Sequence, residues 1–199
     1  MVKKVFIATA RPTGDLCKAW ALRNLPEGFS LVDTVEESDI IISVMYDKIF
    51  KKQQLANRRA FNFHPAPLPD YRGVGLSSWQ LINEETKAGV TLHAIDSGVD
   101  TGDIIEVRNF LIKEGETAQS LYNKTQKLVF KMFQDWFVDV LKGNYEAVSQ
   151  NRRTGRTYRS KDLQRAKDIT KFIRAFCFEG KESAFYYNKD KEKVYIKYE

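Results

Sequence analysis

The chain has 199 residues, of which 43% are hydrophobic and 29% are charged, and its formal net charge is +6. This balance is typical of one globular domain with a small appendage, and the 13% aromatic content excludes a disordered low-complexity chain. No apolar run approaches the roughly 18 residues that a membrane-spanning helix needs, and residues 5–10 predict a first core strand instead of a signal peptide. Cys17 and Cys177 lie far apart without metal-ligand spacing, which favours a reducing cytoplasm.

The first half of the chain predicts strands that are buried on both faces. Apolar runs without alternation cover residues 5–8 and 39–44, and a helix predicted over 15–24 ends before Pro26 and Gly28. Such runs are typical of parallel strands covered by helices. Two further β-rich stretches follow, at 89–95 and 103–112. We therefore expect an α/β fold, Rossmann-like, around a mostly parallel sheet.

The clearest helix is predicted over residues 117–142. Its apolar side chains recur at steps of three and four residues; they are Ala118, Leu121, Tyr122, Leu128, Val129, Met132, Phe133, Trp136, Phe137, Val140 and Leu141. Thr117 can cap the first turn, and Gly143 can end the helix in a left-handed conformation. A hairpin over 183–187 and 193–197 is expected at the C-terminus. We place the main domain at residues 1–148, and a basic linker with a short appendage at 149–199.

The positive charge is concentrated in one segment. Residues 151–174 hold nine basic and two acidic side chains, so the excess of positive charge belongs to this stretch. A basic stripe attracts phosphates, whether of a nucleotide diphosphate or of a tRNA backbone, but it is equally compatible with a solvated surface. Arg152, Arg153 and Arg156 are the candidate phosphate contacts within it.

A polar pair and three prolines follow one another in residues 61–73. Strand alternation turns Asn62 and His64 to one side, with Phe61 and Phe63 on the other side, toward the core. The prolines at 65, 67 and 69 restrict the backbone that follows. Asn62 and His64 are therefore expected at a rigid strand end, where α/β sheets bind ligands, although a lone histidine can equally be a buried structural residue.

A second polar group, residues 96–103, contains three aspartates. Their order lacks the calcium-loop pattern, and satisfying turn backbones is the plainer role for them. Chain spacing alone does not bring Asp100 to His64.

Taken together, these motifs resemble the signature of the folate-dependent formyltransferases. The matching residues are Asn62-x-His64-Pro65, Leu68-Pro69, Arg72-Gly73, Gly89-Val90-Thr91-x-His93 and Asp100-x-Gly102. The resemblance implies Asn62, His64 and Asp100 as the catalytic residues and 10-formyltetrahydrofolate as the formyl donor. It also implies a pterin pocket formed by Met45, Tyr46, Asp47, Lys48, Ile49, Ile95, Asp96 and Val99. Tyr46 is equally compatible with a core aromatic role, and His93 is expected to be structural.

The chemistry of these residues fits formyl transfer. The reaction passes through a tetrahedral carbon that carries an oxyanion, to which an Asn62 N–H and a protonated His64 can donate. Asp100 would orient His64 and raise the fraction of it that carries a proton. Neither a metal nor a covalent enzyme intermediate is needed for this chemistry.

The sequence departs from the family in its short N-terminal half and in lacking a glycine-rich loop after the first strand, which argues against glycinamide ribonucleotide as acceptor. We expect a cytoplasmic enzyme that formylates a nucleotide-linked amino sugar, with Arg72 and the basic segment as substrate contacts. Charged initiator tRNA is the alternative acceptor, and a non-catalytic folate- or nucleic-acid-binding relic is a third reading. No membrane partner is expected, and a homodimer is left open.

Overall fold

The computed structural model describes residues 1–151, 155–159, 169–187 and 190–196. Residues 1–142 contain seven strands and four helices in chain order: β1 (Lys3–Thr9), α1 (Pro12–Asn24), β2 (Phe29–Val32), β3 (Ile40–Val44), α2 (Lys52–Leu55), β4 (Arg59–His64), β5 (Tyr71–Gly73), α3 (Leu76–Ile82), β6 (Lys87–Ala94), β7 (Ile104–Leu111) and α4 (Ala118–Lys142). The segments that follow are β8 (Arg156–Tyr158), α5 (Ile169–Phe176), β9 (Phe185–Tyr187) and β10 (Lys193–Tyr195). The strands and helices expected from the sequence are all present.

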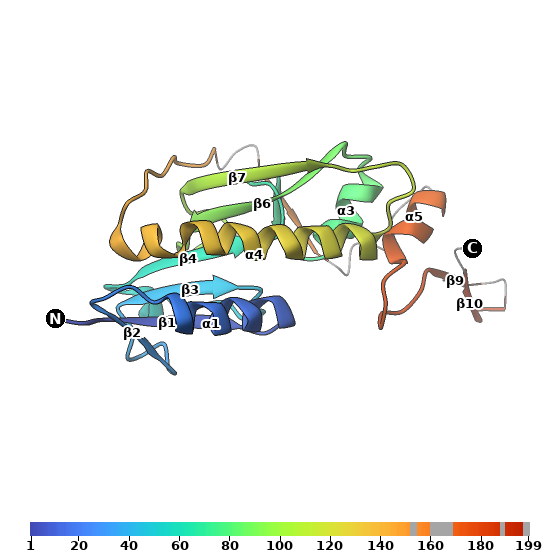
Figure 1. Cartoon of the computed structure of the whole chain (residues 1–199). Coiled ribbons are helices and arrows are strands. Elements are labelled where there is room, and N and C mark those ends of the chain that lie inside the picture. The colour runs from blue at the N-terminus through green and yellow to red at the C-terminus, as the bar shows by residue number, and fades with distance from the viewer. Residues whose placement is uncertain (152–154, 160–168, 188–189, 197–199) are drawn as a thin grey trace.

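A six-stranded sheet in the order β2-β1-β3-β4-β6-β7 forms the centre of the molecule (Figure 1). The first four strands pair in parallel, whereas β6 pairs antiparallel with both β4 and β7. The expected mostly parallel sheet is confirmed, and β4 is the strand at which the pairing changes direction.

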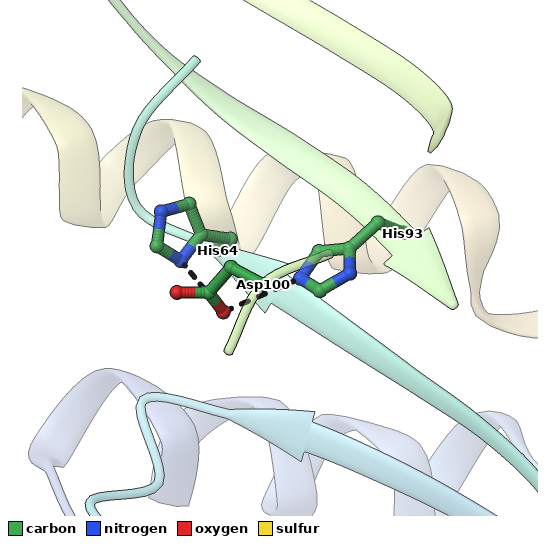
Figure 2. Close-up of side chains that lie close together, drawn as sticks. All are labelled: His64, His93 and Asp100. Atoms are coloured by element: carbon green, nitrogen blue, oxygen red, sulfur yellow. Dashed lines mark ion pairs between the residues drawn. The ribbon is translucent and has the colours of Figure 1, made fainter. Parts of the chain in front are cut away.

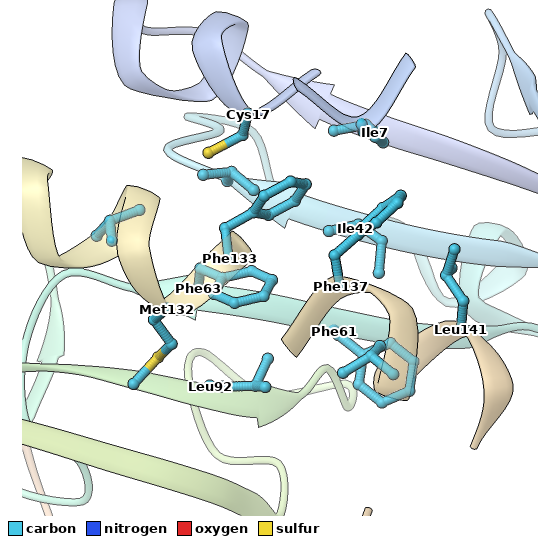
Figure 3. Packing of buried hydrophobic residues seen from close by; sticks show 14 of the residues in the cluster. Ile7, Cys17, Ile42, Phe61, Phe63, Leu92, Met132, Phe133, Phe137 and Leu141 are labelled. Carbon is cyan, nitrogen blue, oxygen red and sulfur yellow. The ribbon is translucent and has the colours of Figure 1, made fainter. Parts of the chain in front are cut away.

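The main core lies between this sheet and two helices on one of its faces. Figure 1 shows α1 and α4 lying along the same face of the sheet. Phe133 and Phe137 of α4 are completely buried and lie close to Phe63 of β4 (Figure 3). Both rings also make edge contacts with Trp20 of α1. The Thr117 hydroxyl accepts the Ser120 N–H at the start of α4, and Gly143 ends the helix in the left-handed conformation, both as predicted. The long helix thus fixes β4 from one side.

The opposite face of the sheet is covered by a short helix and loops. A smaller apolar cluster forms there, in which Ile41 and Ala60 of the sheet pack against Phe50 and Leu55 from the segment around α2. Val35 from the loop after β2 completes it. A four-residue helix and the loops around it therefore cover this face, whereas α1 and α4 cover the other.

The C-terminal segments pack at one end of the sheet. β8 pairs in parallel with β5, and the Tyr158 and Tyr71 rings stack with centroids 4.9 Å apart. Helix α5 packs on α3, where the Ser78 hydroxyl donates to the carbonyl of Ala175. The predicted hairpin forms from β9 and β10, which pair antiparallel. The proposed boundary at residue 148 stays a prediction.

In the part of the chain that the structure describes, none of the helices combines the length and the apolar character that a membrane crossing requires.

Candidate active site

The polar pair predicted on one strand lies on β4, and its neighbour β6 supplies a third polar side chain. Phe61 and Phe63 of β4 face the core, and the alternation turns Asn62 and His64 to the other side. Antiparallel pairing places Asn62 directly opposite His93 on β6. Cross-strand partners approach within about 5 Å at their Cβ atoms, so the antiparallel register itself brings His93 to Asn62.

Asp100 reaches the same place from the loop that follows β6. Its backbone is left-handed, with φ = 52°, and the Gly73 N–H donates to its Oδ2 at 2.9 Å. Gly102 passes so close to the carbonyl of Ala94 that a Cβ at this position would lie 1.9 Å from that oxygen. The side-chain amide of Gln150 donates to the carbonyls of both Asp100 and Gly102, at 3.0 and 2.6 Å. These contacts hold the loop against the end of β4.

Asp100 Oδ1 lies between the two histidines of the chain (Figure 2). It is 3.5 Å from His64 Nδ1 and 3.6 Å from His93 Nε2. His64 is 3% exposed and His93 2%, whereas the Asp100 side chain is 15% exposed. The structure therefore brings together Asn62, His64 and Asp100, which sequence spacing alone could not place, and adds His93 to them.

Backbone carbonyls determine which nitrogen of each imidazole carries its proton. His64 Nε2 lies 2.6 Å from the carbonyl oxygen of Tyr71, and His93 Nδ1 lies 2.6 Å from that of Ala94. A carbonyl can only accept, so each of these nitrogens carries the hydrogen. The other nitrogen of His93 then accepts an N–H of Asn62, across 3.2 Å. His64 Nδ1 is left as the nitrogen that can take up a proton.

The electrostatics of the site favour a neutral His64 beside an ionised Asp100. Burial lowers the pKa of His64 below its ordinary value of 6.5, and the attraction of Asp100 opposes this with a smaller effect. Burial would by itself raise the pKa of Asp100, but His64, His93 and the Gly73 N–H together outweigh it and lower that pKa. Asp100 thus acts on His64 in the expected direction, but it does not keep the buried ring protonated.

A cavity of about 760 Å³ opens beside these groups. All eight residues expected to form a pterin pocket line it, namely Met45, Tyr46, Asp47, Lys48, Ile49, Ile95, Asp96 and Val99, together with Asn62, His64, His93 and Asp100. The Tyr46 ring stacks on Phe50, with centroids 5.3 Å apart. A cavity of this size, lined by apolar side chains together with polar ones, is typical of a small-molecule site.

Two of the arginines expected to bind substrate, Arg72 and Arg156, are described by the structure, and neither is part of this cavity. Arg72 is 4% exposed, donates to Gln150 and does not line the cavity. Its Nε has no hydrogen-bond partner among the residues that the structure describes. Arg156 is exposed on β8, also outside the lining. Arg152 and Arg153 lie outside the described residues. The burial of Arg72 could not be read from its place in a polar loop.

Sequence reasoning missed a second wall of the cavity. This wall contains Phe176, Phe178 and Lys181 from the C-terminal appendage, and residues 73–78 from β5 and the start of α3. Arg11, at the start of α1, and Lys181 add cationic side chains to the lining. The amphipathic sequence of α5, with apolar residues three and four positions apart, indicates that this helix packs on another part of the protein. The sequence does not indicate which part.

Comparison with known proteins agrees with this geometry. A methionyl-tRNA formyltransferase of Geobacter metallireducens is 38% identical over 92 residues, which are 45% of this chain and 30% of that protein. A solved sugar N-formyltransferase of a Shewanella species superposes over 100% of this chain and 98% of its own, with a TM-score of 0.84 at 19% identity. The N-formyltransferase of Helicobacter canadensis, solved with folinic acid and dTDP-3-aminofucose, covers 92% and 83% with a TM-score of 0.79 at 24% identity.

At these identities the superpositions establish the fold. The chain spans between 14% and 52% of the length of the curated relatives that it matches. Residues 26–136, more than half of the chain, match the formyl transferase family. This segment contains Asn62, His64, His93 and Asp100, and the chain belongs to the formyl transferase family.

Proposed function

We propose that the chain is a folate-dependent N-formyltransferase, which moves a formyl group from 10-formyltetrahydrofolate to a primary amine. The observation that carries the proposal is the convergence of Asn62, His64 and Asp100 at one end of an open cavity of about 760 Å³. The apolar wall around Met45, Tyr46 and Ile49 suits a flat pterin ring. Folinic acid bound to the Helicobacter relative supports a folate donor.

The geometry suggests how these side chains divide the work. One N–H of the Asn62 amide donates to His93. Its second N–H faces Asp100 Oδ1, which lies 3.5 Å from Asn62 Nδ2, so this weak hydrogen bond can be replaced by one to a substrate oxygen. This second N–H can donate to the formyl oxygen as it gains negative charge. His64 Nδ1 takes the proton of the attacking amine, the ring is then stabilised by the Asp100 carboxylate, and the proton passes to the departing folate nitrogen.

For the acceptor we propose a nucleotide-linked amino sugar. The solved relatives that superpose over most of the chain include sugar N-formyltransferases, one of them with a dTDP-linked amino sugar. Arg11, Lys48 and Lys181 at the cavity offer positive charge for a diphosphate, in place of the buried Arg72. Charged initiator tRNA is the second candidate, because methionyl-tRNA formyltransferases are among the relatives with the higher identities.

Initial-rate assays with 10-formyltetrahydrofolate distinguish these acceptors. We expect turnover with a dTDP-, UDP- or GDP-linked amino sugar and none with charged initiator tRNA; the reverse result would transfer the proposal to tRNA. His64→Ala and Asp100→Ala should lower kcat by about 100- to 1000-fold. Glu114→Gln, at an exposed position, is the control. Folate binding without turnover on any amine would indicate a non-catalytic relic.

A further inference from the structure

Three electron-pair donors converge on one point in this site, and none of them carries a hydrogen there. The hydrogens of His64 and His93 are directed at the carbonyls of Tyr71 and Ala94, so His64 Nδ1 and His93 Nε2 present lone pairs. Asp100 Oδ1 lies between them as the third donor atom (Figure 2). All three atoms lie within 4.8 Å of one another. Among the described residues, only the Asn62 amide donates a hydrogen bond to any of these three atoms.

We propose that His64, His93 and Asp100 form a binding site for a divalent transition-metal ion, with Zn²⁺ as the best fit, and that the bound ion blocks formyl transfer. The binding half of this proposal is independent of the proposed function, and the inhibitory half rests on it.

The spacing of the donor atoms fits such an ion. Zinc bonds of about 2.0–2.1 Å place two donors of a tetrahedral ion about 3.4 Å apart. The two distances from Asp100 Oδ1, 3.5 Å to His64 Nδ1 and 3.6 Å to His93 Nε2, are close to this value. The two nitrogens lie within 4.8 Å of each other, so bringing them to the tetrahedral spacing takes a combined side-chain movement of up to about 1.4 Å.

The surroundings of the three side chains are those that support metal ligands. A ligating histidine usually donates its other N–H to a carbonyl or carboxylate, which fixes the ring, and both rings here donate to carbonyls at 2.6 Å. The second oxygen of Asp100 is held by the Gly73 N–H. Two imidazoles and one carboxylate suit zinc, nickel or cobalt better than magnesium or calcium, which prefer oxygen ligands.

Metal binding would be incompatible with the role proposed for Asn62. The Asn62 N–H that is now 3.2 Å from His93 Nε2 points at an atom that would become a ligand, so the amide must turn away. The lone pair of His64 Nδ1 would be bound to the ion and could no longer accept a proton from the amine. The cavity beside the three residues leaves room for water or another exogenous ligand on the open side of the ion.

The chain offers a direct test because it contains two histidines and both are in this site. In an untagged, isotope-labelled protein, added Zn²⁺ should shift the ring resonances of both histidines, and Co²⁺ should produce the visible absorption bands of a tetrahedral site. Asp100→Asn and His93→Ala should each weaken Zn²⁺ binding at least about 10-fold in calorimetry. A Cys17→Ser, Cys177→Ser double variant, which removes both thiols, should bind as the wild type does.

Unshifted histidine resonances at millimolar Zn²⁺ would overturn the binding site, and this measurement needs no variant that must fold. Formyl transfer should fall with Zn²⁺ occupancy and recover with EDTA. Zinc bound at both histidines without loss of transfer would overturn the inhibitory half. A protein that transfers no formyl group under any condition would instead contradict the proposed function, while the resonances would still decide on the metal site.

Discussion

Under the proposed function, removal of the Gln150 amide should slow formyl transfer, although this side chain does not line the cavity. The left-handed backbone of Asp100 is unfavourable for a residue with a Cβ by about 1 kcal/mol or more, so something must hold it. Gln150 Nε2 does so by donating to the carbonyls of Asp100 and Gly102, while its Oε1 accepts from Arg72 at 2.9 Å. We infer that Gln150 is a positioning residue for Asp100.

The contacts set the size of the effect. Two partly buried hydrogen bonds contribute about 1 kcal/mol each, so Gln150→Ala removes about 2 kcal/mol of preference for the present loop conformation. If other loop conformations of similar energy exist, the active fraction falls by at most about 30-fold. Arg72 also loses its partner, which should lower the free energy of unfolding by a further 1–3 kcal/mol.

Steady-state rates at several pH values, with urea unfolding alongside, provide the assay. For Gln150→Ala we expect kcat to fall 10- to 30-fold, with little change in the affinity for folate. Gln150→Glu keeps an acceptor for Arg72 but cannot donate to the two carbonyls, so it should regain stability without regaining rate. The reasoning is refuted if Gln150→Ala keeps kcat within twofold of wild type, or if Gln150→Glu restores the rate.

Two further predictions concern stability. Because burial lowers the pKa of His64, the unfolded chain gains a proton below about pH 6.5 that the folded chain resists, so stability should fall with decreasing pH by up to about 1.4 kcal/mol per unit. Urea unfolding at pH 7.5 and 5.5 should show this loss of stability in the wild type, and the loss should be absent in His64→Gln. The lowered pKa of Asp100 affects stability only below about pH 4, outside this pH range. Phe133→Ala should cost 3–5 kcal/mol in the same assay, against under about 0.5 kcal/mol for Leu22→Ala on the exposed face of α1, and equal losses would contradict the assigned core.

The periodic parts of the fold could be predicted from the sequence. Buried runs and the three-and-four spacing of α4 are local signals, and the caps at Thr117 and Gly143 are fixed by neighbouring residues. The strands β5 and β8 gave no such signal, because each has three residues and pairs with a partner about 85 positions away. Gln150 was also missed, because the residues it contacts, Arg72, Asp100 and Gly102, lie 48 to 78 positions away in the sequence.

The candidate site was predicted in part. Asn62 and His64 follow from strand alternation, but Asp100 was assigned through family resemblance, because loop closure between residues 64 and 100 depends on the tertiary structure. The pKa of His64 depends on two opposing effects, because burial lowers it and the charge of Asp100 raises it. Residue types alone do not show which effect is larger. His93 was expected to be structural, but its position opposite Asn62 follows from the antiparallel register of β6.

The change in pairing at β4 explains why these groups meet. Since β6 runs antiparallel, Asn62 and His93 become cross-strand neighbours, and the loop after β6 places Asp100 beside them. The reactive groups are therefore Asn62, His64, His93 and Asp100, whereas residues 73–78 and the appendage form a second wall of the cavity. Under the proposed function, the reactive groups determine the chemistry of formyl transfer, and the second wall selects the amine that reaches it. Exchange of the wall between relatives should then change the acceptor while leaving the reaction itself intact.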